Sequence, residues 1–356
     1  MSAAGLEFKP DWAEAKDRLT RWWKGEPTDR VVAMVTAPRR GVARRPSRTD
    51  VPGKYTDIAT VLHNVDVALE GTFYGGEALP AHWVYLGPVP LSGYMGCPMD
   101  FRPDTVWHGP RFDSWKSARE LEFDPANEWY RLLREITRAS LQRAAGRWLV
   151  SGQGFGCVSD VIADLWGSEP TLMAMLEEPD AVREATRRLV AISKALYDET
   201  DALCAPAQEG SFDWLGLWAP GRMWTLQSDL CCMISPRSFD EFVLGELREE
   251  AEHVDFSFYH LDGPGAIKHL DALLGIEALD GIQWVPGAGA SRDPLDWIDL
   301  FRRVQAGGKK LLIYCPPERV KPLLDRISKR DVCLGIGCPD QDSAERLLAD
   351  LERIGV

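Results

Sequence analysis

The second half of the chain repeats one pattern four times: a short apolar segment of β character is followed by an amphipathic segment of helical period. These four strand–helix units occupy residues 258–274, 282–305, 310–327 and 332–353. Connections of a few residues between strand and helix are typical of a parallel sheet with helices packed outside it. This alternation constrains the fold more than any other feature of the sequence.

The first half fits the same class, although its segments are less regular. Helices are expected over residues 11–24, with Asp11 as the N-cap, over residues 180–199, and from Ser238 onward, with Ser238 as the N-cap. Strands are expected over residues 31–35, 83–86 and 148–150. No glycine-rich nucleotide-binding motif accompanies the first strand, which disfavours an open nucleotide-binding sheet. We therefore expect a single (β/α)8 barrel domain over residues 1–356, with residues 1–28 as an N-terminal helical extension.

Composition excludes several classes of function. The chain has 356 residues, and 41 Lys and Arg against 54 Asp and Glu give a net charge of -13, which argues against nucleic-acid binding. It lacks an apolar stretch of the roughly 20 residues that span a bilayer, and it does not begin like a secretory signal. Eight cysteines at irregular spacing favour reduced thiols. We expect a cytoplasmic protein that acts on a small molecule, and its composition is compatible with a homodimer.

In a barrel of this kind, functional groups gather at the C-terminal ends of the strands. His260 and Asp262 stand two residues apart at such an end, just before Gly263, and side chains at i and i+2 of a strand point to the same side. The other predicted strand ends supply polar and aromatic groups, namely Arg39, Arg40, Gln153, Trp218, Trp284, Cys315 and Cys338.

Three stretches resemble the uroporphyrinogen decarboxylase superfamily, which includes corrinoid methyltransferases. They are residues 156–179, residues 228–243 with the motif Ile234-Ser235-Pro236, and His260-Leu261-Asp262-Gly263 at the place of the family's His-x-Cys-Gly. The resemblance covers roughly residues 140–340. It implies a (β/α)8 barrel with a deep cleft at its C-terminal face.

The methyltransferase branch of that superfamily binds zinc, so the resemblance implies a metal site at His260, Asp262 and Cys315, with Asp229 as a nearby acidic residue. Asp262 stands where the relatives have cysteine, and a His/Asp/Cys set is chemically admissible for zinc. Alternatively, no metal is bound, and His260 and Asp262 bond to substrate or form an acid–base pair. A corrinoid cofactor would come from a separate partner protein, because the chain contains no cobalamin-binding module.

Arginines follow the first strand at Arg39 and Arg40, where the porphyrinogen-binding relatives carry Arg-Gln-Ala-Gly-Arg. The match to that signature is poor, which disfavours a porphyrinogen substrate. Guanidinium groups pair with carboxylates or phosphates, so these residues and Gln153 are candidates for substrate binding. A solvated arginine-rich loop is the equally weighted alternative.

Fourteen tryptophans are unusual, and four of them lie in segments that lead to the predicted cleft, namely Trp214, Trp218, Trp224 and Trp284. Trp218, Tyr259 and Trp284 are therefore candidates for lining a pocket for a flat apolar substrate, although any one of them taken alone is better explained as core.

Together these features favour a methyl (one-carbon) transferase or demethylase that uses a metal. A metal-free decarboxylase or other lyase acting through the His260 and Asp262 pair is the first alternative, and a non-catalytic binding barrel is the second.

Overall fold

Seven strands form the central sheet of the computed structural model, which describes residues 6–43, 45–152 and 157–356. In pairing order they are β2 (Thr72–Gly76), β1 (Val32–Pro38), β13 (Val332–Gly337), β12 (Lys310–Tyr314), β11 (Gly281–Val285), β10 (Phe256–Asp262) and β9 (Met223–Gln227). Neighbouring strands are parallel except for the antiparallel pair β1 and β2. The chain is a mixed α/β protein with a mostly parallel central sheet, as expected.

Within the described residues the sheet does not close, and its edges are β2 and β9. The segment expected as an early barrel strand forms β6 (Leu149–Ser151), which pairs with β3 (Ala81–Trp83) in a separate parallel sheet of two strands. Two antiparallel pairs join β4 (Met99–Phe101) to β5 (Val106–His108) and β7 (Ser211–Phe212) to β8 (Trp218–Ala219). The closed barrel is therefore not confirmed.

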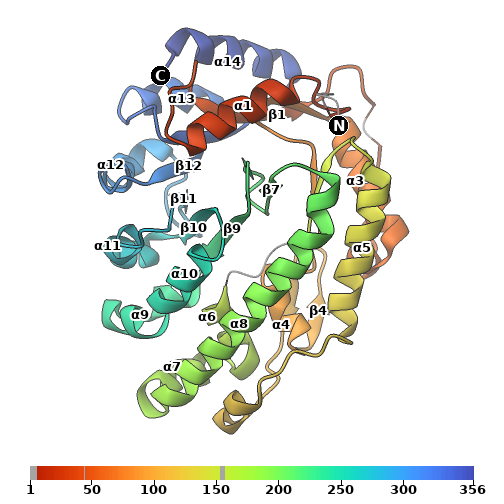
Figure 1. Cartoon of the computed structure of the whole chain (residues 1–356). Coiled ribbons are helices and arrows are strands. Elements are labelled where there is room, and N and C mark those ends of the chain that lie inside the picture. The colour runs from red at the N-terminus through yellow and green to blue at the C-terminus, as the bar shows by residue number, and fades with distance from the viewer. Residues whose placement is uncertain (1–5, 44, 153–156) are drawn as a thin grey trace.

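Helices α9 to α14 lie along the outside of the central strands, whereas α3, α5 and α8 lie on the opposite side of the molecule (Figure 1). The α-helices are α1 (Trp12–Trp23), α2 (Gly53–Thr56), α3 (Ile58–Gly71), α4 (Pro90–Tyr94), α5 (Glu128–Ala144), α6 (Val158–Trp166), α7 (Ser168–Glu177), α8 (Pro179–Cys204), α9 (Pro236–Phe242), α10 (Leu244–Ala251), α11 (Leu270–Leu274), α12 (Ile298–Ala306), α13 (Pro317–Leu324) and α14 (Gln341–Ile354). Short 3-10 helices are η1 (Trp115–Glu120), η2 (Ala205–Ala207), η3 (Leu230–Met233), η4 (Pro264–His269) and η5 (Pro294–Trp297).

Alternate residues of the parallel strands lie on opposite faces of the sheet. We call the face that carries Met34, Phe258 and Leu312 the inner face, because these residues cluster with the tryptophans of α1. The outer face, with Leu261 and Ile313, packs in a larger cluster with the surrounding helices. Burial of both faces explains why these strands are almost continuously apolar.

Aromatic packing fills the N-terminal half of the inner face at β10. The ring of Trp23 lies 4.8 Å from that of Phe256, and the ring of Trp22 stacks 6.2 Å from that of Phe258. Helix α1 therefore covers the beginning of this strand and leaves its C-terminal end, with His260 and Asp262, beyond the helix.

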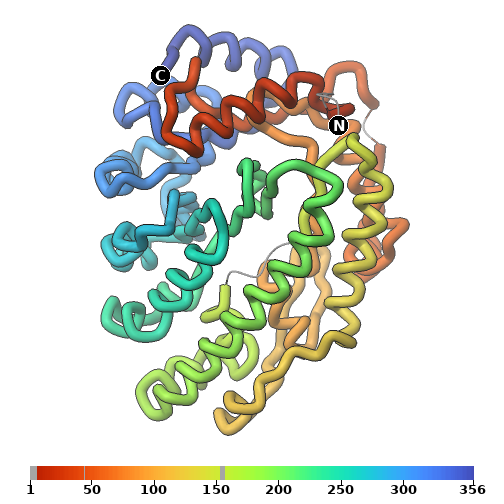
Figure 2. The backbone as a smooth tube through the Cα atoms, viewed as in Figure 1, coloured from red at the N-terminus to blue at the C-terminus, as the bar shows by residue number. Residues whose placement is uncertain are grey.

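The two ends of the chain meet in the sheet, because β1 pairs along its length with β13. Figure 2 shows the red N-terminal helix in the same region as the blue C-terminal segment. None of the helices in the described part of the chain is long and apolar enough to cross a bilayer. The single-domain boundaries and the cytoplasmic location stay predictions.

The predicted strands and helices of the second half are confirmed within a few residues, whereas two predicted caps are wrong. The Asp11 side chain does not cap α1 and instead accepts a hydrogen bond from Lys9 Nζ at 2.9 Å. Helix α9 begins at Pro236, and its cap is Ser235, whose hydroxyl accepts from the backbone N–H of Ser238. The weak strand expected at residues 83–86 lies two residues earlier, as β3.

A matched pair of glycine substitutions tests the packing of the inner face. A Cβ at Gly281 would lie 2.3 Å from the ring of Phe258, whereas a Cβ at Gly245 in α10 would meet no atom within 4 Å. We expect Gly281→Ala to lower the free energy of unfolding by about 1–3 kcal/mol, because the closed aromatic packing must shift. Gly245→Ala should leave it unchanged or raise it by up to about 1 kcal/mol. Urea denaturation of both variants checks this, and equal stabilities would contradict the packing described.

Candidate metal centre

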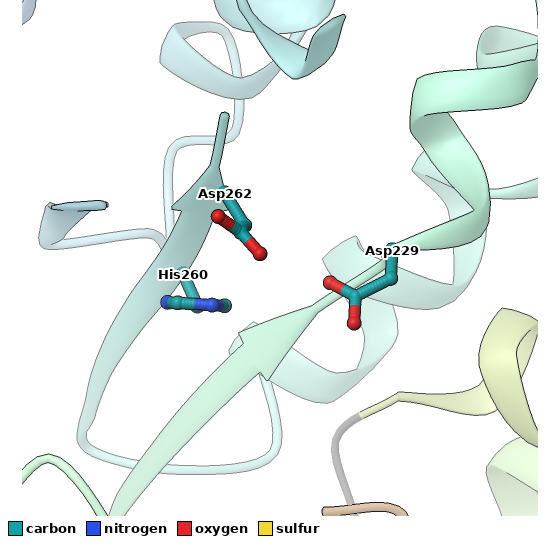
Figure 3. Close-up of side chains that lie close together, drawn as sticks. All are labelled: Asp229, His260 and Asp262. Atoms are coloured by element: carbon teal, nitrogen blue, oxygen red, sulfur yellow. The ribbon is translucent and has the colours of Figure 1, made fainter. Parts of the chain in front are cut away.

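Three side chains from two neighbouring strand ends converge at the C-terminal edge of the sheet. Ligand atoms of Asp229, His260 and Asp262 all lie within 4.8 Å of one another. His260 pairs in register with Gln227 of β9, and Asp229 follows two residues after that strand ends. Parallel pairing and the two-residue period of β10 therefore bring the three groups together. Figure 3 shows their side chains directed toward a shared space.

The orientation of His260 is set by its neighbours on the inner face. Its Nδ1 donates a hydrogen bond to the Oε1 of Gln283, the residue opposite it on β11. The edge of the imidazole also packs against Trp214, with ring centroids 4.9 Å apart. With Nδ1 protonated, the lone pair of the neutral ring is on Nε2, as in the histidine ligands of metal sites.

Asp262 has a carboxylate oxygen that lacks a protein partner. Its Oδ1 is buried without a hydrogen bond from any of the described residues. A Cβ at Gly287 would lie 3.2 Å from this oxygen, and Gly287 has a φ of +70°, so a glycine fits there. A buried carboxylate oxygen without a donor is costly unless a cation or an external donor satisfies it.

Asp229 is held through its backbone. The buried Asp160 carboxylate accepts hydrogen bonds from the N–H groups of Asp229 and Leu230, at 2.9 and 2.8 Å. Burial and the nearby Asp229 charge raise the pKa of Asp160 to about 7. Asp229 is an exposed residue, but partial desolvation of its carboxyl raises its pKa. The electrostatic interaction with His260 lowers the pKa of Asp229, and that with Asp262 raises it further.

The donor set of one imidazole and two carboxylates suits a divalent metal such as zinc, manganese or iron. Ligand atoms around tetrahedral zinc lie about 3.4 Å apart. Separations up to 4.8 Å can close to this value through modest side-chain rotations, since Asp229 is exposed and follows the strand. The residues present therefore fit a metal, and they would bind it through oxygen and nitrogen.

Cys315 does not belong to this group, which corrects the predicted metal set. It follows β12, two strands away from β10, and its thiol is buried and donates to the Pro316 carbonyl at 3.4 Å. Burial and the nearby Glu318 and Asp293 charges raise the pKa of Cys315 to about 12, so the thiolate is disfavoured. Asp229, predicted as an acidic catalytic residue, takes its place beside His260 and Asp262.

The predicted anion-binding arginines are engaged elsewhere. Arg39 donates to the Thr72 carbonyl at 3.0 Å and lies over the Phe8 ring. Arg40 is exposed and forms ion pairs with Asp342 and Glu345 of α14. Gln153 lies outside the described residues.

The three aromatic candidates do not surround the group formed by Asp229, His260 and Asp262. Tyr259 and Trp284 pack in the cluster of the outer face, because each stands next to an inner-face residue in its strand. Trp218 is buried in the inner cluster, where its Nε1 donates to the Glu209 carbonyl at 2.9 Å and its ring meets Trp12.

Gln283 is a residue near the group that sequence reasoning missed. It is fully buried in an otherwise apolar strand, and its polar side chain was the signal that could have identified it. Trp214, which the sequence places among the tryptophans leading to the predicted cleft, lies in the loop after β7 and packs against His260.

Comparison with protein-family models and with curated proteins gives no match for this chain. The assignment of the site therefore depends on its geometry.

Removing the hydrogen-bond acceptor of His260 should weaken a bound metal. We expect Gln283→Leu to lower the affinity for zinc by about 10- to 100-fold, because the ring would lose the bond that fixes its tautomer and orientation. Gln283→Glu retains an acceptor at this position and should recover most of the affinity. Competition with a chromogenic chelator measures both variants, and an unchanged affinity in Gln283→Leu would argue against Nε2 coordination.

Proposed function

We propose that the chain is a metal-dependent enzyme of the uroporphyrinogen decarboxylase superfamily with a barrel-type fold, and that it transfers a methyl group to or from a small molecule. The observation that carries the proposal is the convergence of Asp229, His260 and Asp262, with a buried carboxylate oxygen that no described residue satisfies. The resemblance of residues 140–340 to that superfamily supplies the reaction class, and a separate corrinoid protein is the proposed methyl carrier.

In this proposal the chain's own residues bind and orient. His260 offers Nε2 while Gln283 holds Nδ1, and Asp262 offers the oxygen that has no other partner. Asp229 contributes a carboxylate whose main chain is fixed by Asp160. A bound divalent metal would supply Lewis acidity toward the methyl donor or acceptor. Because no cysteine belongs to the group, we propose that it acts without the sulfur-rich ligand set of the methyltransferase branch.

The surroundings of Arg39 and Arg40 give less support to the alternative of a metal-free lyase. That reaction needs a cation for the substrate carboxylate, and Arg40 is neutralised by Asp342 and Glu345 while Arg39 donates to a backbone carbonyl.

Metal analysis of protein purified without chelator tests the proposal. We expect about one divalent metal per chain in the wild type and its loss in His260→Ala, because the imidazole is the one nitrogen donor of the group. The half-buried His63 provides a control, since His63→Ala removes a histidine on α3 without touching the group. A wild type that binds no metal after incubation with zinc, manganese or iron would refute the proposal.

A further inference from the structure

A cavity of about 470 Å³ opens on the inner face, and none of its lining residues in the described chain is charged. Its walls come from the C-terminal halves of β1, β12 and β13 and from the loop at Leu215 and Gly216. Apolar side chains such as Met34 and Leu79 contribute most of the lining. This volume is within the range of small-molecule sites.

The β12 and β13 side of the cavity is flat. Gly335 and Gly337 occupy successive inner-face positions of β13, so no side chain projects from that strand there. The ring of Tyr314 lies against Gly335, where a Cβ would be 2.5 Å from the ring. A slot bounded by strand backbone and a tyrosine ring favours a planar ring over a bulky aliphatic group.

Tyr314 supplies the polar group of this slot. The residue is 49% exposed although it ends a central strand, and it lines the cavity. Protein atoms around the phenol partly desolvate it and raise the pKa of Tyr314 to about 12, so its hydroxyl stays neutral. Among the described residues, no hydrogen-bond partner of this hydroxyl is found, so it is available to a ligand oxygen.

One loop joins the cavity to the metal-binding group. Trp214 packs against His260, and the next residues, Leu215 and Gly216, line the cavity. Asp213 anchors the loop by accepting hydrogen bonds from the N–H groups of Thr225 and Leu215, at 2.6 and 3.1 Å. A molecule in the cavity would therefore share a wall with the group that contains His260.

We infer that this cavity binds the body of the substrate, and that this body is an uncharged planar aromatic ring with one hydroxyl or ether oxygen directed toward Tyr314. The inference rests on the proposed function for its link to catalysis. A carboxylate on the ring would have no cationic partner among the described residues that line the cavity, so it would be desolvated without compensation.

Fragment binding to the whole protein tests this inference independently of catalysis. The probe is 4-methylphenol, and its matched anion is 4-hydroxybenzoate, in which a carboxylate replaces the methyl group. Titration calorimetry should show that 4-methylphenol binds at least about tenfold more tightly than the anion. Tyr314→Phe should weaken its binding by about three- to tenfold through the lost hydrogen bond.

Gly337→Leu should abolish binding by filling the slot, since a Cβ at Gly337 meets nothing within 4 Å and the cavity is the space beside it. Gly245→Leu makes the same change at an exposed helical position and should leave binding unchanged. No binding to the wild type, equal or tighter binding of the anion, or full binding to Gly337→Leu would overturn the inference. Metal content measured on the same samples keeps the two proposals apart, because its loss with intact fragment binding would refute only the proposed function.

Discussion

Replacing Asp262 with alanine is expected to lower the affinity of the protein for a divalent metal by at least about 100-fold. Loss of a residue that only supports a ligand already costs 10- to 100-fold, and Asp262 is proposed to bind the metal directly. Its Oδ1 is buried without a hydrogen-bond partner among the described residues, so none of these residues takes the place of the metal in the apo protein. Removal of the carboxylate should therefore also remove an unsatisfied oxygen.

The same substitution should therefore stabilise the metal-free protein, although it weakens metal binding. Without metal, Asp262→Ala should raise the free energy of unfolding by about 1–3 kcal/mol, because a buried oxygen without a hydrogen-bond partner among the described residues is removed. Asp299→Ala removes a fully exposed aspartate and should change neither property. Chelator competition and urea denaturation, each on metal-free protein, measure the two effects. An unaltered metal affinity in Asp262→Ala would contradict the assignment of this ligand.

Glu250→Gln is expected to stabilise the protein at pH 8 much more than at pH 5. Glu250 is fully buried in α10, its Oε1 accepts from Ser193 Oγ at 3.3 Å, and its Oε2 has no partner among the described residues. Burial raises the pKa of Glu250 to about 8, with Ser193 and Lys194 opposing and Glu249 adding to the rise. The native protein thus keeps this carboxyl protonated at neutral pH.

The sign follows from proton binding in the two states. Between the ordinary glutamate pKa near 4.5 and the native value near 8, the unfolded chain has released the proton and the native chain has retained it. The contribution of Glu250 to the free energy of unfolding is fully present below this pH window, and it falls by about 1.4 kcal/mol per pH unit within the window. Glutamine cannot titrate, so its advantage should grow by about 3 kcal/mol between pH 5 and pH 8.

Glu249→Gln is the matched control, because it makes the same change of charge one residue earlier, at a side chain that is 62% exposed. Denaturant titrations of the wild type and both variants at the two pH values measure the effect. A pH-independent difference between Glu250→Gln and the wild type would mean that Glu250 is ionised in the native protein at neutral pH.

Local periodicity predicted the pairing of His260 with Asp262, because a two-residue spacing on one strand does not depend on the rest of the fold. The same rule excludes Tyr259 and Trp284 from that face, since Tyr259 is adjacent to His260 and Trp284 to Gln283 along their strands. The prediction that these two aromatic residues line the site followed from their residue type, whereas their positions in the strands place them on the outer face.

Long-range pairing was harder to predict. The choice between Asp229 and Cys315 depended on which strands flank β10, and β12 is separated from it by β11. The engagement of Arg40 could not be foreseen, because its partners Asp342 and Glu345 lie about three hundred residues later in the chain. Closure of the barrel was likewise inferred from the regular second half, whereas β3 and β6 of the first half pair apart from the central sheet.

The identity of the third metal ligand is the most direct test of the proposed metal site. The structure places Asp229 beside His260 and Asp262, whereas the sequence suggested Cys315. Zinc stoichiometry should be measured by mass spectrometry on Asp229→Ala and Cys315→Ser, each reconstituted with zinc and freed of excess metal. We expect Asp229→Ala to retain little zinc and Cys315→Ser to retain about one ion per chain, since Asp229, unlike Cys315, lies with His260 and Asp262. Full zinc in Asp229→Ala together with its loss in Cys315→Ser would contradict the account.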